Sequence, residues 1–348
     1  MTAAVFKLFA NCIPVRGARR SLLCDLQTGR LKLIPNSLFE VLTEHKDRPP
    51  EDIKAAYQHQ FDTELDEYFA FLVGQGWGFW CEEPESFPDL DLSYDIPERI
   101  TNAVIDSDRS SKHDYVSLID QLEDLGCKHI QFRFFDPVPL SEIEKVAEAS
   151  RNRRLRGIEL LAPFGPEFED REQLTEWCRR YPRIVAFTLT GAPAYLLEHT
   201  SPTSKFMGLL VYHPDKVHDH TCCGVIDKAY FTVSMPTFTE ALHFNSCLNR
   251  KISVDAKGCI KNCPSLKQSF GHSRDTKLHE ALESEGFQDI WSITKDRVSI
   301  CKDCEFRYVC TDCRAVTEED DPLGKPARCG YDPYTATWQR DPTLPFPV

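Results

Sequence analysis

Residues 301–313 read CKDCEFRYVCTDC, so four cysteines lie within one short stretch. They belong to a larger cluster, because ten of the 15 cysteines lie between Cys222 and Cys329. Thiolates are the soft ligands that zinc and iron–sulfur clusters prefer, and a two-residue spacing lets both sulfurs reach one metal centre from a single turn. In a reducing compartment such a cluster indicates metal ligation rather than disulfides. The stretch therefore predicts a turn-rich, metal-dependent region.

The composition excludes several classes of protein. The 348 residues include 54 acidic and 41 basic side chains, for a net charge of −13, which argues against nucleic-acid binding. No apolar run approaches the roughly 18 residues of a membrane span, and residues 1–7 lack the features of a signal peptide. We therefore expect a cytoplasmic protein with no membrane partner. The remaining cysteines are isolated in apolar settings and are interpreted as core residues: Cys12, Cys24, Cys81, Cys127 and Cys178.

The region upstream of the cysteines, residues 97–215, alternates strand-like and helix-like segments. Repeated βα units imply parallel strands with helical crossovers, so the fold class is α/β, either a partial (β/α) barrel or an open parallel sheet. The expected strands are 100–105, 130–135, 157–161, 184–189 and 207–212, and the expected helices are 113–125, 140–150 and 171–180.

The N-terminal region, residues 1–90, predicts a small module of its own. Segments 22–26 and 30–34 form a β-hairpin closed at Gly29, and helices are expected at 37–42, 51–59 and 64–73. Residues 82–95 are rich in proline and acidic side chains and are interpreted as a linker. Residues 216–348 form the cysteine-rich third region, which buries little apolar area of its own.

The cysteine spacing outside the opening stretch is also regular. Cys247 is followed by Gly258 and then Cys263-Pro264, and Cys329 comes last. The whole pattern resembles the SPASM domain of radical-SAM peptide maturases. Every interval matches except one, because Cys310 and Cys313 are separated by two residues where the family usually has three.

The resemblance implies two auxiliary [4Fe–4S] clusters. Cys301, Cys304, Cys310 and Cys329 would bind the second cluster, and Cys247, Cys263 and Cys313 the first. The family's fourth ligand to the first cluster has no counterpart just before Cys247, and the candidates are Cys222, Cys223, His243 and Cys259. Zinc or mononuclear iron remains the alternative metal.

A narrower resemblance covers nearly the whole chain. The stretches 222–226, 245–253, 261–264, 310–314 and 329–334 are similar to the SPASM maturase of the grasp-with-spasm system. In that system the maturase is encoded beside an ATP-grasp ligase and a small precursor peptide. The resemblance therefore implies maturation of a ribosomally made peptide, with the precursor peptide and the ATP-grasp ligase as partners.

The order hairpin, helix, helix, helix resembles the PqqD-like leader-recognition module, a small winged-helix fold. Such modules bind a leader peptide as an added strand at a sheet edge, where backbone pairing supplies affinity. The resemblance implies a peptide-binding edge formed by Arg30, Leu31, Lys32, Leu33 and Ile34, with Tyr68, Phe71 and Leu72 beneath it. The alternative is that these residues form only a small core and an unused edge.

One expected motif is missing. Radical-SAM enzymes bind their catalytic cluster through Cys-x3-Cys-x2-Cys after the first barrel strand, but residues 106–112 read DSDRSSK and contain no cysteine. We therefore expect no radical chemistry with S-adenosylmethionine. Asp106 and Asp108 are interpreted as N-caps rather than as an acid/base pair. Three functions stay open: a peptide-binding and presentation factor, an iron-dependent oxidoreductase, or a structural zinc protein.

Overall fold

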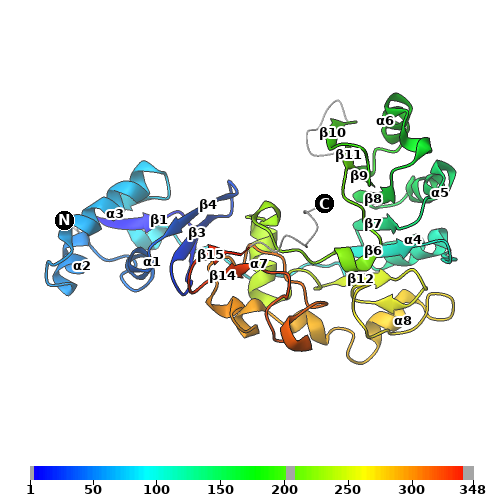
Figure 1. Ribbon diagram of the computed structural model, residues 1–348. Helices are drawn as coiled ribbons and strands as arrows, with labels where there is room; N and C mark the ends of the chain where they lie inside the picture. The colour runs from blue at the N-terminus through cyan, green and yellow to red at the C-terminus, as the bar shows by residue number, and fades with distance from the viewer. Residues whose placement is uncertain (1–3, 201–207, 340–348) are drawn as a thin grey trace.

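The computed structural model describes residues 4–200 and 208–339. It is a mixed α/β structure, with an N-terminal module at one end and a large sheet at the other (Figure 1). Part of the cysteine-rich region, including α7 (Met235–His243), β14 (Tyr331–Asp332) and β15 (Thr337–Trp338), lies between these two parts, and the rest joins the large sheet. None of the described helices is long and apolar enough to cross a membrane.

The N-terminal module contains the predicted hairpin and three helices. Strands β2 (Cys12–Val15), β3 (Ser21–Asp25) and β4 (Arg30–Ile34) form one antiparallel sheet, and β1 (Val5–Leu8) pairs with β5 (Gly78–Cys81) in a second. The helices are α1 (Asn36–Thr43), α2 (Pro50–Ala56) and α3 (Asp62–Gly74). The β3–β4 turn needs a positive φ, and Gly29 supplies it at 75°. The sequence pattern did not indicate β1, β2 or β5.

The large sheet confirms the predicted alternation of parallel strands and helices. Its strand order is β10-β11-β9-β8-β7-β6-β12-β13, and the six strands from β11 to β12 run parallel. The first five strands in chain order are β6 (Asn102–Ser107), β7 (His129–Phe134), β8 (Gly157–Pro163), β9 (Ile184–Thr190) and β10 (Leu196–His199). The last three are β11 (Leu209–His213), β12 (Lys251–Val254) and β13 (Ile260–Lys261).

Two strands of this sheet come from the cysteine-rich region. Strand β12 pairs in parallel with β6, and β13 pairs with β12 in the antiparallel sense. The sheet therefore continues past residue 215, where the sequence pattern placed a change of region. Strand β10 was also not indicated, and residue 207 of the expected strand 207–212 lies outside the described residues.

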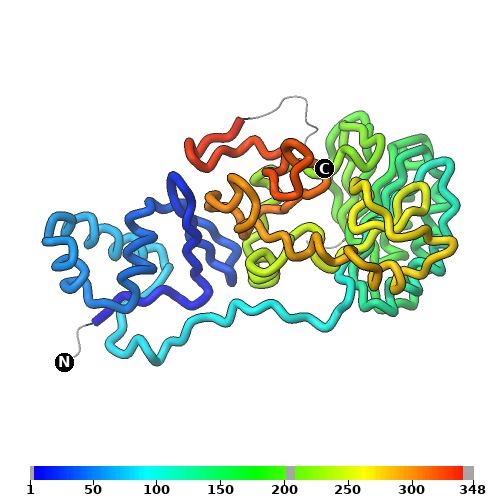
Figure 2. Tube along the Cα trace, turned by 90° about the horizontal axis from the view of Figure 1, so that it is seen from below, coloured from blue at the N-terminus to red at the C-terminus, as the bar shows by residue number. Residues whose placement is uncertain are grey.

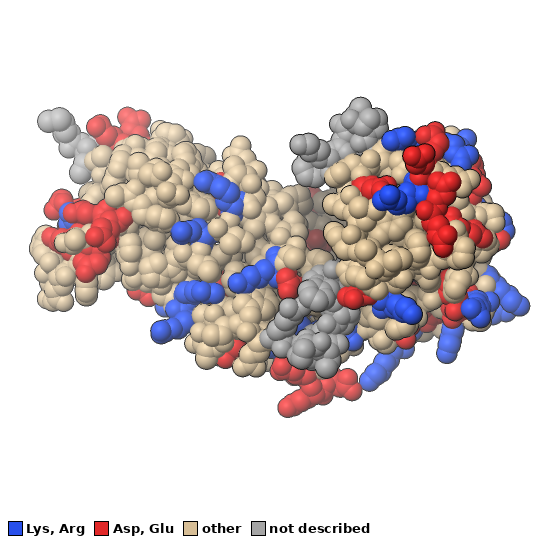
Figure 3. Space-filling view, turned by 45° about the horizontal axis from the view of Figure 1, so that its top comes forward, with Lys and Arg blue, Asp and Glu red and all other residues tan. Residues whose placement is uncertain are grey.

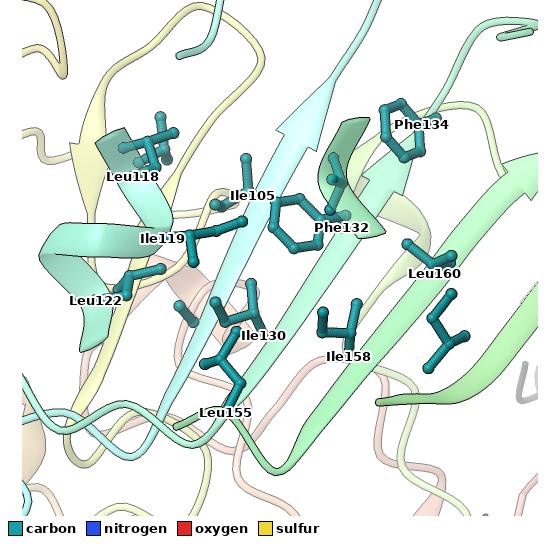
Figure 4. Close-up of a cluster of buried hydrophobic side chains, with 14 of the residues drawn as sticks. Ile105, Leu118, Ile119, Leu122, Ile130, Phe132, Phe134, Leu155, Ile158 and Leu160 are labelled. Atoms are coloured by element: carbon teal, nitrogen blue, oxygen red, sulfur yellow. The ribbon is translucent and has the colours of Figure 1, made fainter. Parts of the chain in front are cut away.

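Helices α4 (Tyr115–Asp124), α5 (Leu140–Ser150) and α6 (Arg171–Arg180) pack on one face of the sheet. Helix α4 packs on the sheet through Leu118, Ile119 and Leu122. These side chains face every second residue of the strands, such as Ile105 and Phe132, and all five residues are at most 2% exposed (Figure 4). Alternation along each strand sends the intervening side chains, such as Asp106 and Arg133, to the opposite face. The helix-covered face is thus the apolar core, and the opposite face carries the buried charged side chains of Asp106 and Arg133.

The cysteine-rich region has little regular structure, as its composition predicted. Its helices are α7 (Met235–His243) and α8 (Leu278–Glu283), and its last two strands are β14 (Tyr331–Asp332) and β15 (Thr337–Trp338). Short 3-10 turns are found in the chain at Pro84–Ser86, Pro166–Phe168, His220–Cys222, Lys228–Tyr230, Asp289–Ser292, Lys295–Arg297, Cys301–Asp303 and Glu318–Asp320.

The N-terminal module and the cysteine-rich region share a hydrophobic core. One face of the β2-β3-β4 sheet contributes Leu22 and Cys24, which pack with Phe238, Phe306 and Tyr331. The segment joining β5 to β6 runs in an extended path beside this contact (Figure 2). It is anchored there by Tyr94, whose hydroxyl donates to Glu240 at 3.2 Å. The predicted linker is thus packed against its neighbours.

Candidate functional site

The structure gathers eight cysteines into two groups. In the first cysteine group, Cys247, Cys263 and Cys223 raise the pKa of Lys251 against the effect of its burial, and Cys313 is the fourth member of the group. Cys247 and Cys223 raise the pKa values of both Cys263 and Cys313, in addition to the larger effect of burial. The Lys251 ammonium lies 3.7 Å from the Cys247 sulfur. The Lys251 cation therefore interacts with three of the four thiols, and Cys313 interacts with Cys247 and Cys223.

Two local features hold the first group in place. Gly224 has a φ of 92°, and a Cβ there would lie 2.8 Å from the Cys313 sulfur, so the chain next to Cys223 packs directly on Cys313. The buried side chain of Asn245 accepts the backbone N–H of Cys247 at 3.0 Å and donates to Asp312 at 2.8 Å. The asparagine thus connects the segments that carry Cys247 and Cys313.

In the second cysteine group, Cys301, Cys304, Cys310 and Cys329 lie around Lys295. The Lys295 ammonium is buried and donates to the backbone carbonyl of Cys310. Burial raises the pKa of Cys301 to about 12 and that of Cys310 to about 11, and the positive charge of Lys295 opposes both shifts. The group packs against the core shared with the N-terminal module.

These donor sets fit a metal centre in number and kind. Each group offers four thiols, the ligand set of structural zinc and of cubane iron–sulfur clusters. Within the described residues no three or more His, Cys, Asp or Glu side chains already converge to hold a metal ion. The raised pKa values mean that the buried thiols are protonated at neutral pH, so metal binding would displace protons.

The other three proposed ligands of the first group lie in different settings. His243, at the end of α7, donates from Nε2 to the carbonyl of Leu92 at 2.9 Å. The backbone of Cys259 forms an isolated antiparallel β-bridge with His272, in the turn after β12. Cys222 ends a 3-10 turn one residue before Cys223. Of the four candidates, Cys223 is the one whose charge interacts with Cys263 and Cys313.

The predicted peptide-binding residues lie along β4 and α3. Strand β4 is at the edge of its sheet, and Leu31, its second residue, is 42% exposed. The Lys32 ammonium lies over the ring of Phe71 at 5.5 Å, so β4 and α3 are neighbours. Ile34 and Leu72 are buried in the module's core, and they support this edge from beneath.

The remaining members complete the edge. The guanidinium of Arg30 stacks on Trp77 at 4.7 Å and donates to Asp25 at 3.1 Å. Tyr68 is half-buried on α3 and its hydroxyl hydrogen-bonds with Ser37 at 2.7 Å, while Leu33 packs toward the shared core. The exposed surface of this edge is therefore formed by Arg30, Leu31 and Lys32, with the half-buried rings of Tyr68 and Phe71 beside it.

Sequence reasoning missed a buried ion pair at the carboxyl ends of β6 and β7. Arg133 donates to both oxygens of Asp106, at 2.7 and 2.8 Å. Burial raises the pKa of Asp106 and the guanidinium opposes this shift. The interpretation of Asp106 as an N-cap is therefore wrong, because α4 is capped by Asp114 instead. Asp108 forms a local turn by accepting the N–H of Ser110 at 2.8 Å.

No family model and no curated protein matches this chain. Among solved structures, the chain is similar to SuiB from Streptococcus suis bound to S-adenosylmethionine, with a TM-score of 0.35, and to SuiB bound to the precursor peptide SuiA, with a TM-score of 0.36. Sequence identity is 9% in both cases. The alignments cover 92% of this chain and 98% and 99% of those chains.

Proposed function

We propose that this protein takes part in the maturation of a ribosomally made peptide. The β4 edge of the N-terminal module binds the leader of the precursor peptide as an added strand. The two cysteine groups hold [4Fe–4S] clusters, with Cys223 as the fourth ligand of the first. An ATP-grasp ligase acts on the same peptide, as the sequence resemblance implies.

One observation carries this proposal: the peptide edge and the second cysteine group belong to one packed unit. Cys304, Cys310 and Cys329 pack against the core to which β3 contributes Leu22 and Cys24. The backbone N–H of Ala18, in the β2–β3 loop, also donates to the Asp303 carbonyl at 2.7 Å. A peptide bound at β4 would therefore be held at a fixed position relative to a metal centre.

The loop after β6 supports a binding role rather than radical chemistry. Its sequence lacks the three cysteines that an S-adenosylmethionine cluster needs. Asp106, at the end of β6, is committed to the ion pair with Arg133. We therefore propose a factor that binds and presents the peptide, and clusters with four thiolate ligands would supply structural support or electron transfer when bound.

Two observations keep the alternative functions in view. Four thiols per group are equally the ligand set of structural zinc. Cys223 is solvent-exposed, unlike the other members of its group, so an iron centre there would be open on one side and could act on the peptide. Both alternatives predict a different metal content or a different peptide product.

The test is anaerobic purification followed by iron, sulfide and zinc analysis and a visible spectrum. About eight irons and eight sulfides per chain are expected, because two cubane clusters each hold four of both. A colourless protein with about two zinc ions would contradict the cluster proposal. Peptide binding is tested separately, by anisotropy with any short peptide found to be encoded beside this gene, and a peptide mass change without the ligase would favour the oxidoreductase.

A further inference from the structure

A pocket outside the two cysteine groups is lined by four basic side chains. It has a volume of about 570 Å³ and lies beyond the carboxyl ends of strands β6 and β12, where parallel sheets place their ligands. Its walls are the loop before α4, the turn between β12 and β13, and the segment before α8. The basic residues are Lys112, Lys257, Arg274 and Lys277.

The pocket is positively charged, whereas the protein as a whole is negatively charged. The chain carries a net charge of −13, yet Asp114 is the one carboxylate among the pocket's lining residues. In the part of the chain that the structure describes, none of the four cations forms an ion pair, whereas Lys261 and Lys267 nearby both do. Cations gathered without ion-pair partners attract an anion, because their mutual repulsion is then relieved.

The walls of the pocket are fixed by hydrogen bonds between its segments. The hydroxyl of Ser111 donates to the Ala256 carbonyl at 2.6 Å, which joins the first two walls. His272 hydrogen-bonds through Nε2 to the Lys257 carbonyl at 2.8 Å, which joins the second and third. Gly258, with a φ of 90°, lets the His272 ring approach, since a Cβ there would lie 2.6 Å from it. The cations therefore project from a built frame.

The arrangement favours carboxylates over phosphate. The first turn of α4 is not free to bind a dense anion, because Asp114 already accepts the Ser117 N–H at 3.0 Å and places its own negative charge there. The cations are spread over three segments, which suits single negative charges spaced along an extended chain. A long polyanion such as nucleic acid would meet the acidic surface elsewhere, and Figure 3 shows acidic side chains on both ends of the molecule.

We infer that this pocket binds an acidic segment of the precursor peptide, rich in aspartate or glutamate. The inference rests on the proposed peptide-binding function and names the chemistry of the peptide that the protein accepts. Leader binding at β4 and acidic-segment binding here would be separate contacts with one substrate.

The test uses fluorescence anisotropy with a ten-residue glutamate-rich peptide and a matched glutamine peptide at low salt. The variant Lys112→Gln/Lys257→Gln/Arg274→Gln/Lys277→Gln should lose at least tenfold in affinity for the acidic peptide. All four side chains are exposed, so the fold should survive, which circular dichroism checks. The control set Lys46→Gln/Lys145→Gln/Arg154→Gln/Lys267→Gln removes the same charge from other exposed sites and should bind like wild type.

Each outcome decides the inference. Equal binding by the pocket variant and the control variant would overturn it, as would wild-type binding of the glutamine peptide as tightly as the acidic one. Stronger competition by inorganic pyrophosphate than by the acidic peptide would replace it with a phosphate site. Failure of the proposed function would give a different result: the wild-type protein would bind the acidic peptide but no precursor leader peptide.

Discussion

The guanidinium of Arg20 donates from Nε to the carboxylate of Glu305 at 2.8 Å, and so joins the N-terminal module to the loop that carries Cys301 and Cys304. Glu305 is completely buried, and Tyr331 donates to the same oxygen. A buried carboxylate needs a compensating cation, and here that cation comes from the other end of the chain. The position of the module on the cysteine-rich region is therefore determined by charge as well as by apolar packing.

Replacing this arginine should destabilise the contact between the two parts. Arg20→Met leaves the Glu305 carboxylate buried without its cation, which costs about 3 kcal/mol of unfolding free energy, at the low end for a broken buried pair because Arg20 is partly exposed. Urea unfolding measures the loss. The control is Arg16→Met, which breaks an exposed ion pair with Glu40 and should cost under about 1 kcal/mol. Equal losses in both variants would contradict the role given to Arg20.

The β3–β4 hairpin should weaken at acid pH through Asp25. Burial raises the pKa of Asp25, but hydrogen bonds from Thr28, Arg30 and Asn11 outweigh it and hold the pKa at about 2. A depressed pKa contributes stability above the unfolded-state value of about 3.9, and this stability is lost as the pH falls through the folded-state value. Wild type should therefore exceed Asp25→Asn in stability at neutral pH, and the difference should shrink between about pH 4 and pH 2.

Denaturant unfolding at several pH values tests this expectation. Glu67→Gln, at an exposed position on α3, removes one negative charge outside the hairpin and serves as the matched control. A stability difference between wild type and Asp25→Asn that stays constant down to pH 2 would show that the Asp25 carboxylate contributes nothing through its ionisation.

The fold was predictable where a pattern is local. The βα alternation predicted the parallel strands and α4 to α6, because each segment carries its own apolar period. It did not predict that β12 pairs with β6, since that pairing joins residues about 150 positions apart in the chain. Strand β10 was missed because it is a four-residue edge strand with an alternating exposure pattern that turn-rich sequence also produces.

The candidate site was predictable to the same extent. Cysteine spacing indicated a metal-binding region, but the assignment of cysteines to two groups came from the family resemblance, which left Cys223 as one of four candidates. The spacing did not indicate Lys251 or Lys295, because neither lysine belongs to a sequence motif. Their role is visible only from their contacts with Cys247 and Cys310 in the folded chain. Asp106 was misinterpreted because a carboxylate before a helix ordinarily caps it. Its partner, Arg133, lies on the next strand and could be found only from the sheet register.

The metal content of single-cysteine variants should show whether Cys223 is the fourth ligand of the first cluster. Cys223→Ser removes the thiol that interacts with Cys263 and Cys313, so iron and sulfide should fall toward half of the wild-type value. Cys259→Ser is the matched control. It also removes one thiol, but from the turn between β12 and β13, where the backbone of Cys259 forms an isolated β-bridge with His272. Anaerobic iron and sulfide analysis of both variants gives the result. Loss of metal in the Cys259 variant alone would assign the fourth ligand to Cys259.

Peptide binding should depend on the exposed N-terminal part of β4. Leu31→Asp places a charge on the strand edge and should lower the affinity for the precursor leader at least tenfold, while the unfolding free energy changes little because Leu31 is 42% exposed. Leu197→Asp is the control, since Leu197 is 44% exposed on the edge strand β10, in a different part of the fold. Isothermal titration of each variant measures the effect. Unchanged affinity in the Leu31 variant would remove β4 as the docking edge.

Breaking the Asp106–Arg133 ion pair should lower the unfolding free energy of the large sheet. Asp106→Asn leaves the Arg133 guanidinium buried without a counter-charge, which costs about 3–5 kcal/mol. Asp106→Leu/Arg133→Met removes both charges, and a pair of well-packed apolar residues there should restore most of that loss.

The exposed pair of Arg109 and Asp136 provides the control, because the same single replacement, Asp136→Asn, should cost under about 1 kcal/mol. Urea unfolding of the three variants ranks them. The double variant separates two roles for the ion pair. If it folds as stably as wild type and keeps its peptide affinity, the pair has a structural role alone at the carboxyl end of the sheet. If it is stable but no longer binds peptide, the buried charges are needed to position the residues that contact the peptide.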